Sequence, residues 1–366
     1  MTVPSNLLSA DQPQFLRLGN MQGTQTPVRV GIILPFTNGS AATRQLAAAM
    51  MKSAELALFD SHNPNILLMS ADEGSTPGEA ANAARQLLNQ GAEIIVGPLF
   101  SQSVQAVAPL ARERGVPVVA FSTDSSVAGD GVYLLSFQPE NEVKRIVDYA
   151  VSQGHSTFAA LVPATPYGVR VEQTLKNEVA LDGATIGTVE RFTPDADAMI
   201  GPAQRVAASG ADAILVAQGG SLLRGIAPTL TITSGPQPQL LGTGVWDDPT
   251  ITQEASLSGA WFAAPAPYSD DGFQAKYKAV FDTEAPQLAT LPYDAISLIS
   301  LLAPGQPYHR FTREALSDPN GFAGINGIFR FNPDGTSDRG LAILSVRPGG
   351  FVVVNPAPST FEKPQS

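Results

Sequence analysis

The stretch "GAEIIVGPLFSQSVQAVAPLARERGVPVVAFSTDSS", residues 91–126, decides the fold class. Its two apolar runs, "AEIIVGP" and "VPVVAFS", have the continuous hydrophobicity of strands that are buried on both faces. Between them "SQSVQAVAPLARERG" predicts a helix that a glycine ends. Each strand runs straight into small polar residues, Ser101 to Ser103 after the first and Ser122 to Ser126 after the second. The pattern predicts parallel strands whose carboxyl ends meet at one hydroxyl-rich edge of a sheet.

The same alternation of strand and helix continues on both sides of this stretch. It starts at "VRVGIILPF" and begins again after residue 140, with "TFAALVPA", "ATIGTVERF", "ADAILVAQGG" and "PQLLGTGVW" as further strands. One helix has a clear start, because Thr76 and Glu79 form a capping-box pattern around Pro77. Turn residues 332–335 and 348–350 predict two hairpins near the end of the chain. We therefore expect an α/β fold with two doubly wound, mostly parallel-sheet lobes.

Composition limits the function. The chain has 366 residues, enough for two domains, and 43% of them are hydrophobic. A net charge of −11 argues against a nucleic-acid partner, and zero cysteines exclude disulfides and thiolate chemistry. We see no apolar run long enough to cross a membrane and no signal peptide after Met1. The polar composition of residues 1–27 predicts a flexible leader, and the Pro-rich end of the chain predicts a loose tail.

The hydroxyl-rich loops suggest a binding site for a small carboxylate. In open parallel sheets, ligands bind beyond the carboxyl ends of the strands, where helices begin and present unpaired N–H groups. Three loops of the first sheet fit this description, because residues 37–40 follow its first strand in the same way. The alternative is that these side chains only cap helices. The candidates in this sheet are Asn38, Ser101, Gln102, Ser103, Ser122, Thr123 and Ser125.

The second sheet offers further candidates at its own edge. Tyr167 is placed to stack on a ligand or donate its hydroxyl, and Asp247 to pair with an ammonium group. The alternatives are a packed turn residue for Tyr167 and helix capping for Asp247. The candidates in this sheet are Tyr167, Gln218, Ser221, Trp246 and Asp247.

No pattern of catalytic residues emerges from the sequence. It contains no H-E-x-x-H, no P-loop and no G-x-S-x-G motif. His62, His155 and His309 have no ligand-like neighbours in the sequence, and we read them as ordinary surface residues. We therefore expect a protein that is not an enzyme and holds no cofactor or metal.

The chain resembles the type I periplasmic binding proteins of the leucine/isoleucine/valine-binding class. The resemblance lies in the stretches "VRVGIILPFTNGSAA", "EIIVGPLFSQSVQAVAP", "PYGVRVEQTLKNEV" and "GIFRFNPDG". The resemblance implies two α/β lobes joined by three crossing segments, with a ligand cleft between the lobes. The implied divisions are a leader (1–27), lobe 1 (28–137 and 266–322), lobe 2 (138–265 and 323–356) and a tail (357–366).

The resemblance also implies a function. A periplasmic receptor, which we expect to be a monomer, would bind a small amino-acid-like or carboxylate ligand and serve an ABC permease. Ser101 and the Ser122–Ser126 turn would hold the carboxylate, and Tyr167 would line the cleft. The chain departs from the class at Gly244, where amino-acid-binding members carry an acidic residue, and at Ser221, where an aromatic residue is common.

A second resemblance leaves an alternative open. The chain is also similar to the alphaproteobacterial lipoproteins classed as penicillin-binding protein activators. This similarity lies in the stretches "FSTDSSVAGDGVYLL", "GAWFAAP" and "DPNGFAGINGIFRFNPDG". This likeness implies a lipid-anchored regulator of peptidoglycan synthesis, with a penicillin-binding protein as partner. A repressor of the same superfold would need a helix-turn-helix domain, for which the leader is too short.

Overall fold

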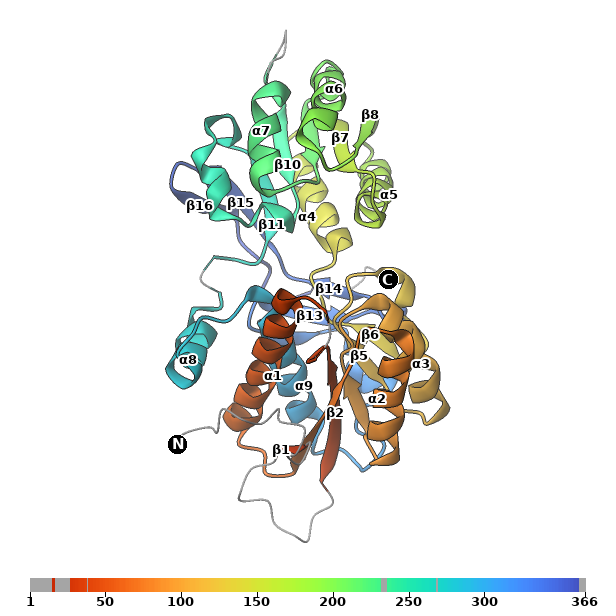
Figure 1. Cartoon of the computed structure of the whole chain (residues 1–366). Helices are drawn as coiled ribbons and strands as arrows, with labels where there is room; N and C mark the ends of the chain where they lie inside the picture. Colours follow the sequence, from red (N-terminus) through yellow and green to blue (C-terminus); the bar gives the residue numbers. More distant parts are fainter. Residues whose placement is uncertain (1–14, 17–26, 38, 232–235, 268, 362–366) are drawn as a thin grey trace. The chain divides into compact units, whose positions relative to one another are not determined.

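The computed structural model describes residues 15–16, 27–37, 39–231, 236–267 and 269–361. Two compact units divide the chain. Unit 1 holds residues 1–136, 268–339 and 360–366, and unit 2 holds residues 137–267 and 340–359. Each unit is an α/β layer structure with a mainly parallel sheet between helices (Figure 1). The predicted fold class is therefore confirmed.

Unit 1 is built on a six-stranded sheet in the order β1-β3-β2-β4-β5-β6. Strands β2 to β6 run parallel, and β1 is antiparallel to β3. The inner strands are buried on both faces, which explains their unbroken runs of Val, Ile and Leu. The strands are β1 (Phe15–Leu16), β2 (Val28–Leu34), β3 (Ile66–Asp72), β4 (Ile94–Val96), β5 (Val118–Ala120) and β6 (Val132–Leu134).

The main helices of unit 1 pack as two pairs, α1 with α9 and α2 with α3 (Figure 1). Thr76 Oγ1 accepts the N–H of Glu79 at 3.3 Å, and Glu79 Oε2 accepts the N–H of Thr76 at 3.0 Å. This capping box confirms the predicted start of α2. The helices are α1 (Ala41–Ser61), α2 (Pro77–Asn89), α3 (Ser101–Glu113), α8 (Asp271–Phe281), α9 (Thr290–Leu302) and α10 (Arg313–Leu316).

A small antiparallel sheet of β12 (Phe322–Gly324), β13 (Gly327–Phe331) and β14 (Ser337–Arg339) also belongs to unit 1. The turn between β13 and β14 is the predicted hairpin. It packs against β6, because the N–H of Leu134 donates to the carbonyl of Gly335 at 2.8 Å and the ring of Tyr133 lies 5.3 Å from that of Phe331. We expected residues 323–339 in lobe 2. That boundary is wrong, because these contacts hold the segment in unit 1.

Unit 2 contains a seven-stranded sheet in the order β16-β15-β11-β10-β9-β7-β8. The strands from β11 to β8 in this order run parallel, while β15 is antiparallel to β11 and to β16. The turn between β15 and β16 is the second predicted hairpin. The strands are β7 (Thr157–Pro163), β8 (Thr185–Phe192), β9 (Ala213–Val216), β10 (Gln239–Gly242), β11 (Trp261–Ala264), β15 (Ala342–Arg347) and β16 (Gly350–Asn355).

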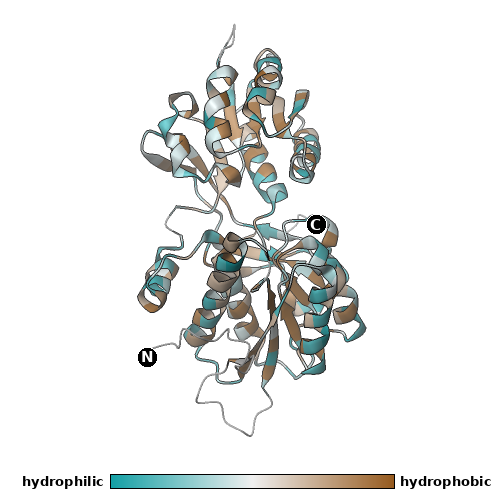
Figure 2. Cartoon of the chain, viewed as in Figure 1, coloured by the Kyte–Doolittle hydropathy of each residue, from teal (hydrophilic) through white to brown (hydrophobic). Residues whose placement is uncertain are grey.

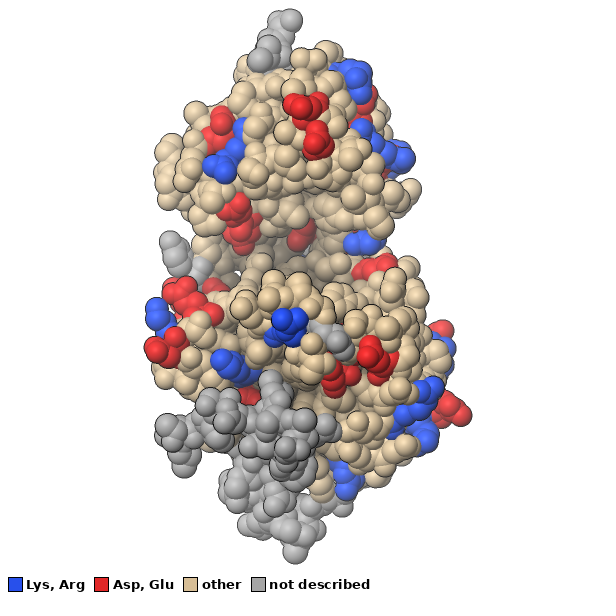
Figure 3. All heavy atoms as spheres, viewed as in Figure 1, with Lys and Arg blue, Asp and Glu red and all other residues tan. Residues whose placement is uncertain are grey.

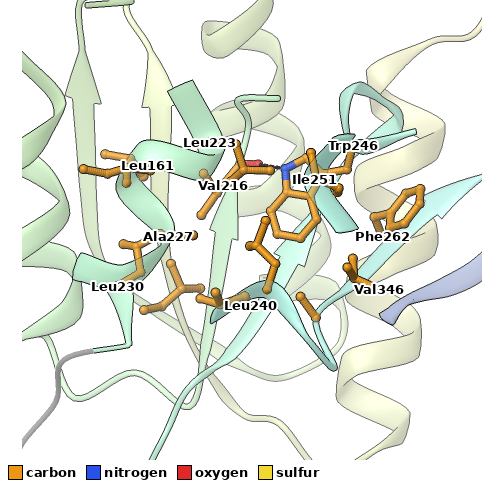
Figure 4. Close-up of a cluster of buried hydrophobic side chains, with 14 of the residues drawn as sticks. Leu161, Val216, Leu223, Ala227, Leu230, Leu240, Trp246, Ile251, Phe262 and Val346 are labelled. Atoms are coloured by element: carbon orange, nitrogen blue, oxygen red, sulfur yellow. Dashed lines mark hydrogen bonds between the residues drawn. The ribbon is translucent and has the colours of Figure 1, made fainter. Parts of the chain in front are cut away.

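The helices of unit 2 also pack as two pairs, and each pair covers its own apolar core. In Figure 2 the inner strands are largely brown, whereas the helices also carry hydrophilic residues along part of their length. Helices α6 and α7 cover a cluster that includes Leu161, Val216 and Leu240 (Figure 4). The helices are α4 (Pro139–Ser152), α5 (Pro166–Leu181), α6 (Ala196–Ala207) and α7 (Gly220–Leu230).

Three local predictions differ from the structure. The strand predicted to run to Trp246 ends at Gly242, and Gly244–Trp246 forms a 3₁₀ turn, η2, that folds the indole back beneath the strand. Within the predicted leader, β1 pairs with β3, while residues 1–14 and 17–26 lie outside the described residues.

The predicted loose tail also makes contacts. The guanidinium of Arg330 lies 4.5 Å from the ring centre of Phe361, so a cation–π contact holds residue 361 against unit 1, and residues 362–366 are not described. Among the described residues, no helix combines the length and the apolar character that crossing a bilayer requires.

Candidate functional site

The carboxyl ends of β2, β4 and β5 meet at one edge of unit 1. Their parallel register places Leu34, Val96 and Ala120 near this edge, each followed by a polar loop. In the first loop Ser40 caps α1 by accepting the N–H of Thr43 at 3.0 Å. The predicted ligand residue Asn38 lies outside the described residues. The edge that the sequence predicts therefore exists, and its first loop is at least partly a helix cap.

A buried carboxyl, Glu73, organises the second loop. Its oxygens accept the N–H groups of Leu99 at 2.9 Å and Phe100 at 3.1 Å, and the hydroxyl of Ser103 also bonds to it. Burial raises the pKa of Glu73, although these three hydrogen bonds act in the opposite direction. Ser103 is buried and bonded to Glu73, so its hydroxyl supports the loop. Its contact with a solute stays a prediction from the sequence.

Ser101 stands at the first helical residue of α3, beside the turn that Glu73 holds. It is partly exposed, and among the described residues its hydroxyl has no hydrogen-bond partner. The next residue, Gln102, is exposed. A hydroxyl at this position, with the unpaired N–H groups and positive dipole end of a thirteen-residue helix, can bind an anion.

The third loop of unit 1 is held by bonds within itself. Ser122 is buried, and its Oγ accepts the N–H of Asp124 at 3.1 Å. Asp124 in turn accepts the N–H and hydroxyl of Ser126 and caps the short 3₁₀ turn that starts at Ser125. Thr123 is exposed. Each serine oxygen of this self-capped loop keeps a further lone pair or a proton with which a ligand could bond.

In unit 2, Tyr167 lies in the first turn of α5. Its hydroxyl forms a 2.7 Å hydrogen bond with Thr243 Oγ1, which lies just beyond the end of β10. Burial, reinforced by the nearby carboxyl of Glu142, raises the pKa of Tyr167 above its ordinary range, so the phenol stays neutral. Tyr167 thus occupies the carboxyl edge of this sheet, as the sequence predicts.

Glu142 shares this edge, and sequence reasoning missed it. It lies in α4, and its Oε2 accepts the N–H of Gly244 at 2.9 Å. Burial is the main reason that the pKa of Glu142 is raised to about 8. The hydrogen bond from Gly244 acts to lower this pKa, and the nearby charges of Glu140 and Asp247 act to raise it. The signal in the sequence was an acidic residue one turn after Pro139, which also fits an ordinary helix start.

Trp246 does not face a ligand. It is fully buried, and its indole N–H donates to the carbonyls of Val216 at 3.0 Å and Gln218 at 2.9 Å (Figure 4). A Cβ at Gly242 would lie 2.1 Å from the ring, which shows how closely the indole packs against β10. The prediction that Trp246 binds the ligand is therefore wrong. An aromatic residue in a loop sequence gave no sign that the chain folds back beneath its own strand.

The other candidates of unit 2 are accessible. Gln218 is half-buried and donates to the carbonyl of Gly219 at 3.1 Å, whereas Ser221 is exposed in the first turn of α7. Asp247 is exposed, and its charge acts on Glu142.

On the face drawn in Figure 3, Lys and Arg lie scattered among Asp and Glu. Within the described ranges, no group of three or more His, Asp or Glu side chains is arranged to hold a metal ion.

The family model described as "Periplasmic binding protein" matches residues 27–350. This chain belongs to the periplasmic binding protein family. Among solved structures, this periplasmic binding protein resembles a putative branched-chain amino acid ABC transporter from Rhodospirillum rubrum, with a TM-score of 0.78, 18% identity, and coverage of 90% of this chain and 100% of that one. Both lobes of the type I fold are thus present.

Two further proteins illustrate the likeness. One is a solute-binding protein from Rhodopseudomonas palustris, crystallised with 4-hydroxybenzoate, with a TM-score of 0.65, 20% identity, and coverage of 92% of this chain and 97% of that one. The other is an uncharacterised Rickettsia prowazekii protein, 23% identical over 175 residues. That match covers 48% of this chain and 46% of the Rickettsia protein, so it spans about half the length of this curated relative.

Proposed function

We propose that this periplasmic binding protein is a non-enzymatic receptor for a small solute that is amino-acid-like or carries another carboxylate. Ser101 carries the proposal. Its hydroxyl, which has no hydrogen-bond partner among the described residues, stands at the start of α3, where the helix dipole and the N–H groups of the first turn favour an anion. Glu73 keeps the preceding turn in place, so the position is preorganised. The relative that was crystallised with 4-hydroxybenzoate supports a carboxylate solute.

Other residues complete the proposed contacts. In unit 1 the Ser122–Ser125 turn would supply hydroxyl and backbone donors, and Gln102 an exposed amide. In unit 2 the neutral hydroxyl of Tyr167 would contact the solute, with Gln218, Ser221 and Asp247 nearby at the same edge. Asn38 remains a prediction from the sequence. These groups bind and orient a solute but include no nucleophile paired with a base, which is why we propose a receptor and not an enzyme.

The proposed setting is the periplasm, where a monomer would deliver the solute to the permease of an ABC importer. The similar protein from Rhodospirillum rubrum is described as a putative branched-chain amino acid ABC transporter, and this likeness supports the proposed setting. Free diffusion and lipid anchoring are both compatible with the proposal.

Isothermal titration calorimetry tests the proposal directly. The panel pairs each carboxylate with the amide that lacks its negative charge: benzoate with benzamide, 4-hydroxybenzoate with 4-hydroxybenzamide, and L-leucine with L-leucinamide. We expect at least one carboxylate to bind with micromolar or better affinity and its amide to bind at least tenfold more weakly. Recovery of the solute unchanged after overnight incubation, checked by NMR, tests the absence of catalysis.

An absence of binding across this panel and the remaining natural amino acids would contradict the receptor proposal. Specific capture of a penicillin-binding protein by the purified chain, together with that absence, would instead support the regulator that the second sequence resemblance implies.

A further inference from the structure

A pocket of about 400 Å³ opens at the amino edge of the unit 2 sheet, where β10 and β11 begin. Because the strands here run parallel, this edge is the opposite end of the sheet from Tyr167 and Thr243. Pockets that hold small molecules typically have volumes of about 300–1,000 Å³. The polar side chains that line this pocket are His155, Thr231, Gln237, Gln239, Ser256 and Ser258.

The lining of this pocket carries no formal charge apart from what its imidazole can acquire. Among the described residues, no Asp, Glu, Lys or Arg lines it. Two carboxylates beside it are already engaged. Glu254 accepts the N–H of Ser256 at 3.0 Å and its hydroxyl at 2.6 Å, and Asp212 accepts the N–H groups of Ser156 at 3.0 Å and Thr157 at 3.1 Å. A charged ligand would lose hydration here without meeting an opposite charge, so the pocket favours a neutral polar ligand.

Three side chains of the lining have hydrogen-bonding capacity to offer such a ligand. Nε2 of Gln239 donates to the carbonyls of Leu240 at 3.1 Å and Gly259 at 3.0 Å, which fixes the amide and leaves its Oε1 as an acceptor. Gln237 and Ser258 are exposed, and neither side chain bonds to any residue that the structure describes. An amide and a hydroxyl each donate and accept. The pocket therefore offers donors and acceptors together.

The wall of the pocket is held in place from behind. Nδ1 of His155 lies 3.7 Å from Oδ1 of Asp212, and its ring packs edge-on against Trp261 with ring centres 5.7 Å apart. Gly259 has a φ of +88°, and a Cβ built on it would meet no atom within 4 Å, so the space beside this backbone is open. The pocket is thus formed before any ligand arrives, on residues that adjoin the starts of strands.

We propose that this pocket binds a neutral sugar, either free or as the end unit of an oligosaccharide. Each sugar hydroxyl donates and accepts at once, which suits the fixed acceptor of Gln239 beside the hydroxyl of Ser258 and the amide of Gln237. The carbon atoms of the sugar ring would lie against the buried side chains of Pro238 and Leu240 in the same lining. The inference goes beyond the proposed receptor function, because the pocket lies at the other end of the sheet.

An NMR titration of the ¹⁵N-labelled full chain tests the proposal. The probes are glucose, N-acetylglucosamine, maltose and chitobiose, with glucuronate as the charged counterpart of glucose. The chain has two tryptophans, and only Trp261 contacts His155, whereas Trp246 is buried beneath β10. We expect a neutral sugar to shift the Gly259 amide and the Trp261 indole, with a dissociation constant of about 1 mM or tighter, and to leave the Trp246 indole unmoved. Tighter binding of a disaccharide would identify an oligosaccharide end, and equal binding a free sugar.

Variants at exposed positions separate binding from folding. Gln237→Ala combined with Ser258→Ala should weaken sugar binding at least about tenfold and leave the melting temperature unchanged, because neither side chain bonds within the described protein. Gln173→Ala is the matched control on α5. Its amide donates to Asn177 at 3.0 Å, away from the pocket, and its loss should leave sugar binding unchanged. The double variant should also keep the binding of any carboxylate that the calorimetry identifies.

Other results would overturn the sugar pocket. These are an absence of shifts with every sugar, equal affinity for glucose and glucuronate, or full affinity in the double variant. Shifts centred on Gly168 and Gly244 would place the sugar at the carboxyl edge and overturn the assignment to this pocket. None of these results bears on carboxylate binding, so the receptor proposal and the sugar pocket fail or stand separately.

Discussion

Nη1 of Arg339 lies 4.0 Å from Oδ2 of Asp294, and both side chains are 1% exposed. Asp294 also accepts the N–H of Ile325 at 2.8 Å, and the guanidinium of Arg339 lies 5.7 Å from the ring centre of Phe329. Arg339 ends β14 and is the last residue of unit 1 before the chain enters unit 2. This buried pair therefore secures the point where the chain leaves unit 1.

Removing one member of this pair should be costly. We expect Asp294→Ala to lower the free energy of unfolding by about 3–5 kcal/mol, because it removes the carboxylate that lies beside the buried charge of Arg339. Asp338→Ala is the matched control. Its ion pair with Arg330, at 2.7 Å, is partly exposed and should contribute less than about 1 kcal/mol. Urea unfolding followed by circular dichroism measures both, and similar losses would contradict the prediction.

Stability should fall as the pH rises. Burial raises the pKa of Glu142 to about 8, of Glu55 to about 7 and of Asp294 to about 6. In the unfolded chain these groups titrate near pH 4, so the folded state binds their protons more tightly. Their contribution is complete below about pH 4 and is lost as the pH rises through 6 to 8. We expect a lower urea midpoint at pH 9 than at pH 5.5.

Glu142→Gln should reduce this pH dependence, mostly above pH 7, because it removes the group with the highest of the three pKa values. A urea midpoint that rises from pH 5.5 to pH 9 in the wild type would show that these carboxyls are not held neutral in the folded protein.

Trp246 should matter for stability and not for binding. Trp246→Phe removes an N–H that serves two carbonyl groups and leaves a gap beneath β10, so we expect a loss of about 2–4 kcal/mol. Val245→Ala, at an exposed neighbouring position, should cost less than about 0.5 kcal/mol. If Trp246→Phe weakened solute binding without lowering the melting temperature, the assignment of Trp246 to the core would be wrong.

Gly244 and Glu142 should be energetically coupled. Gly244→Ala places a methyl carbon 2.4 Å from Glu142 Oε1, and we expect it to cost about 1–3 kcal/mol through displacement of the carboxyl. In a Glu142→Ala background the same substitution should cost much less. A double-mutant cycle on urea unfolding measures the difference, and additive effects would show that the two positions do not compete for space.

Ser101→Ala tests the anion position of unit 1. If the hydroxyl is desolvated against a bound carboxylate, its loss should weaken binding by about 1–3 kcal/mol, measured by calorimetry with the tightest carboxylate of the panel. Ser61→Ala, at the end of α1, is the control and should leave affinity unchanged. Its hydroxyl donates to the carbonyl of Leu58 at 2.7 Å. Unchanged affinity in Ser101→Ala would mean that the residue only starts a helix.

Much of the fold could be read from local patterns. The strand preceding Gly97 and the helix capped by Thr76 have signals within a few residues, namely an unbroken apolar run and a capping box. The edge that holds Ser101 and Ser122 in unit 1, and the separate edge that holds Tyr167 in unit 2, follow from the rule that parallel strands bring their carboxyl ends together. The boundary at residue 323 failed because its position depends on packing between β6 and the later hairpin, which no local pattern encodes.

By itself, the sequence determined the alternation of strands and helices, the parallel sheets and the polar loops at their ends, because periodicity and turn chemistry act over short distances. Only the tertiary structure decided which polar groups at those ends are already used. Glu73 holds the loop before α3, Ser103 bonds to Glu73, and Trp246 lies in the core. Glu142 reaches Gly244 across the fold of unit 2, and its burial raises its pKa. Burial and long-range contact set the chemistry of these groups, and both arise only when distant segments pack together.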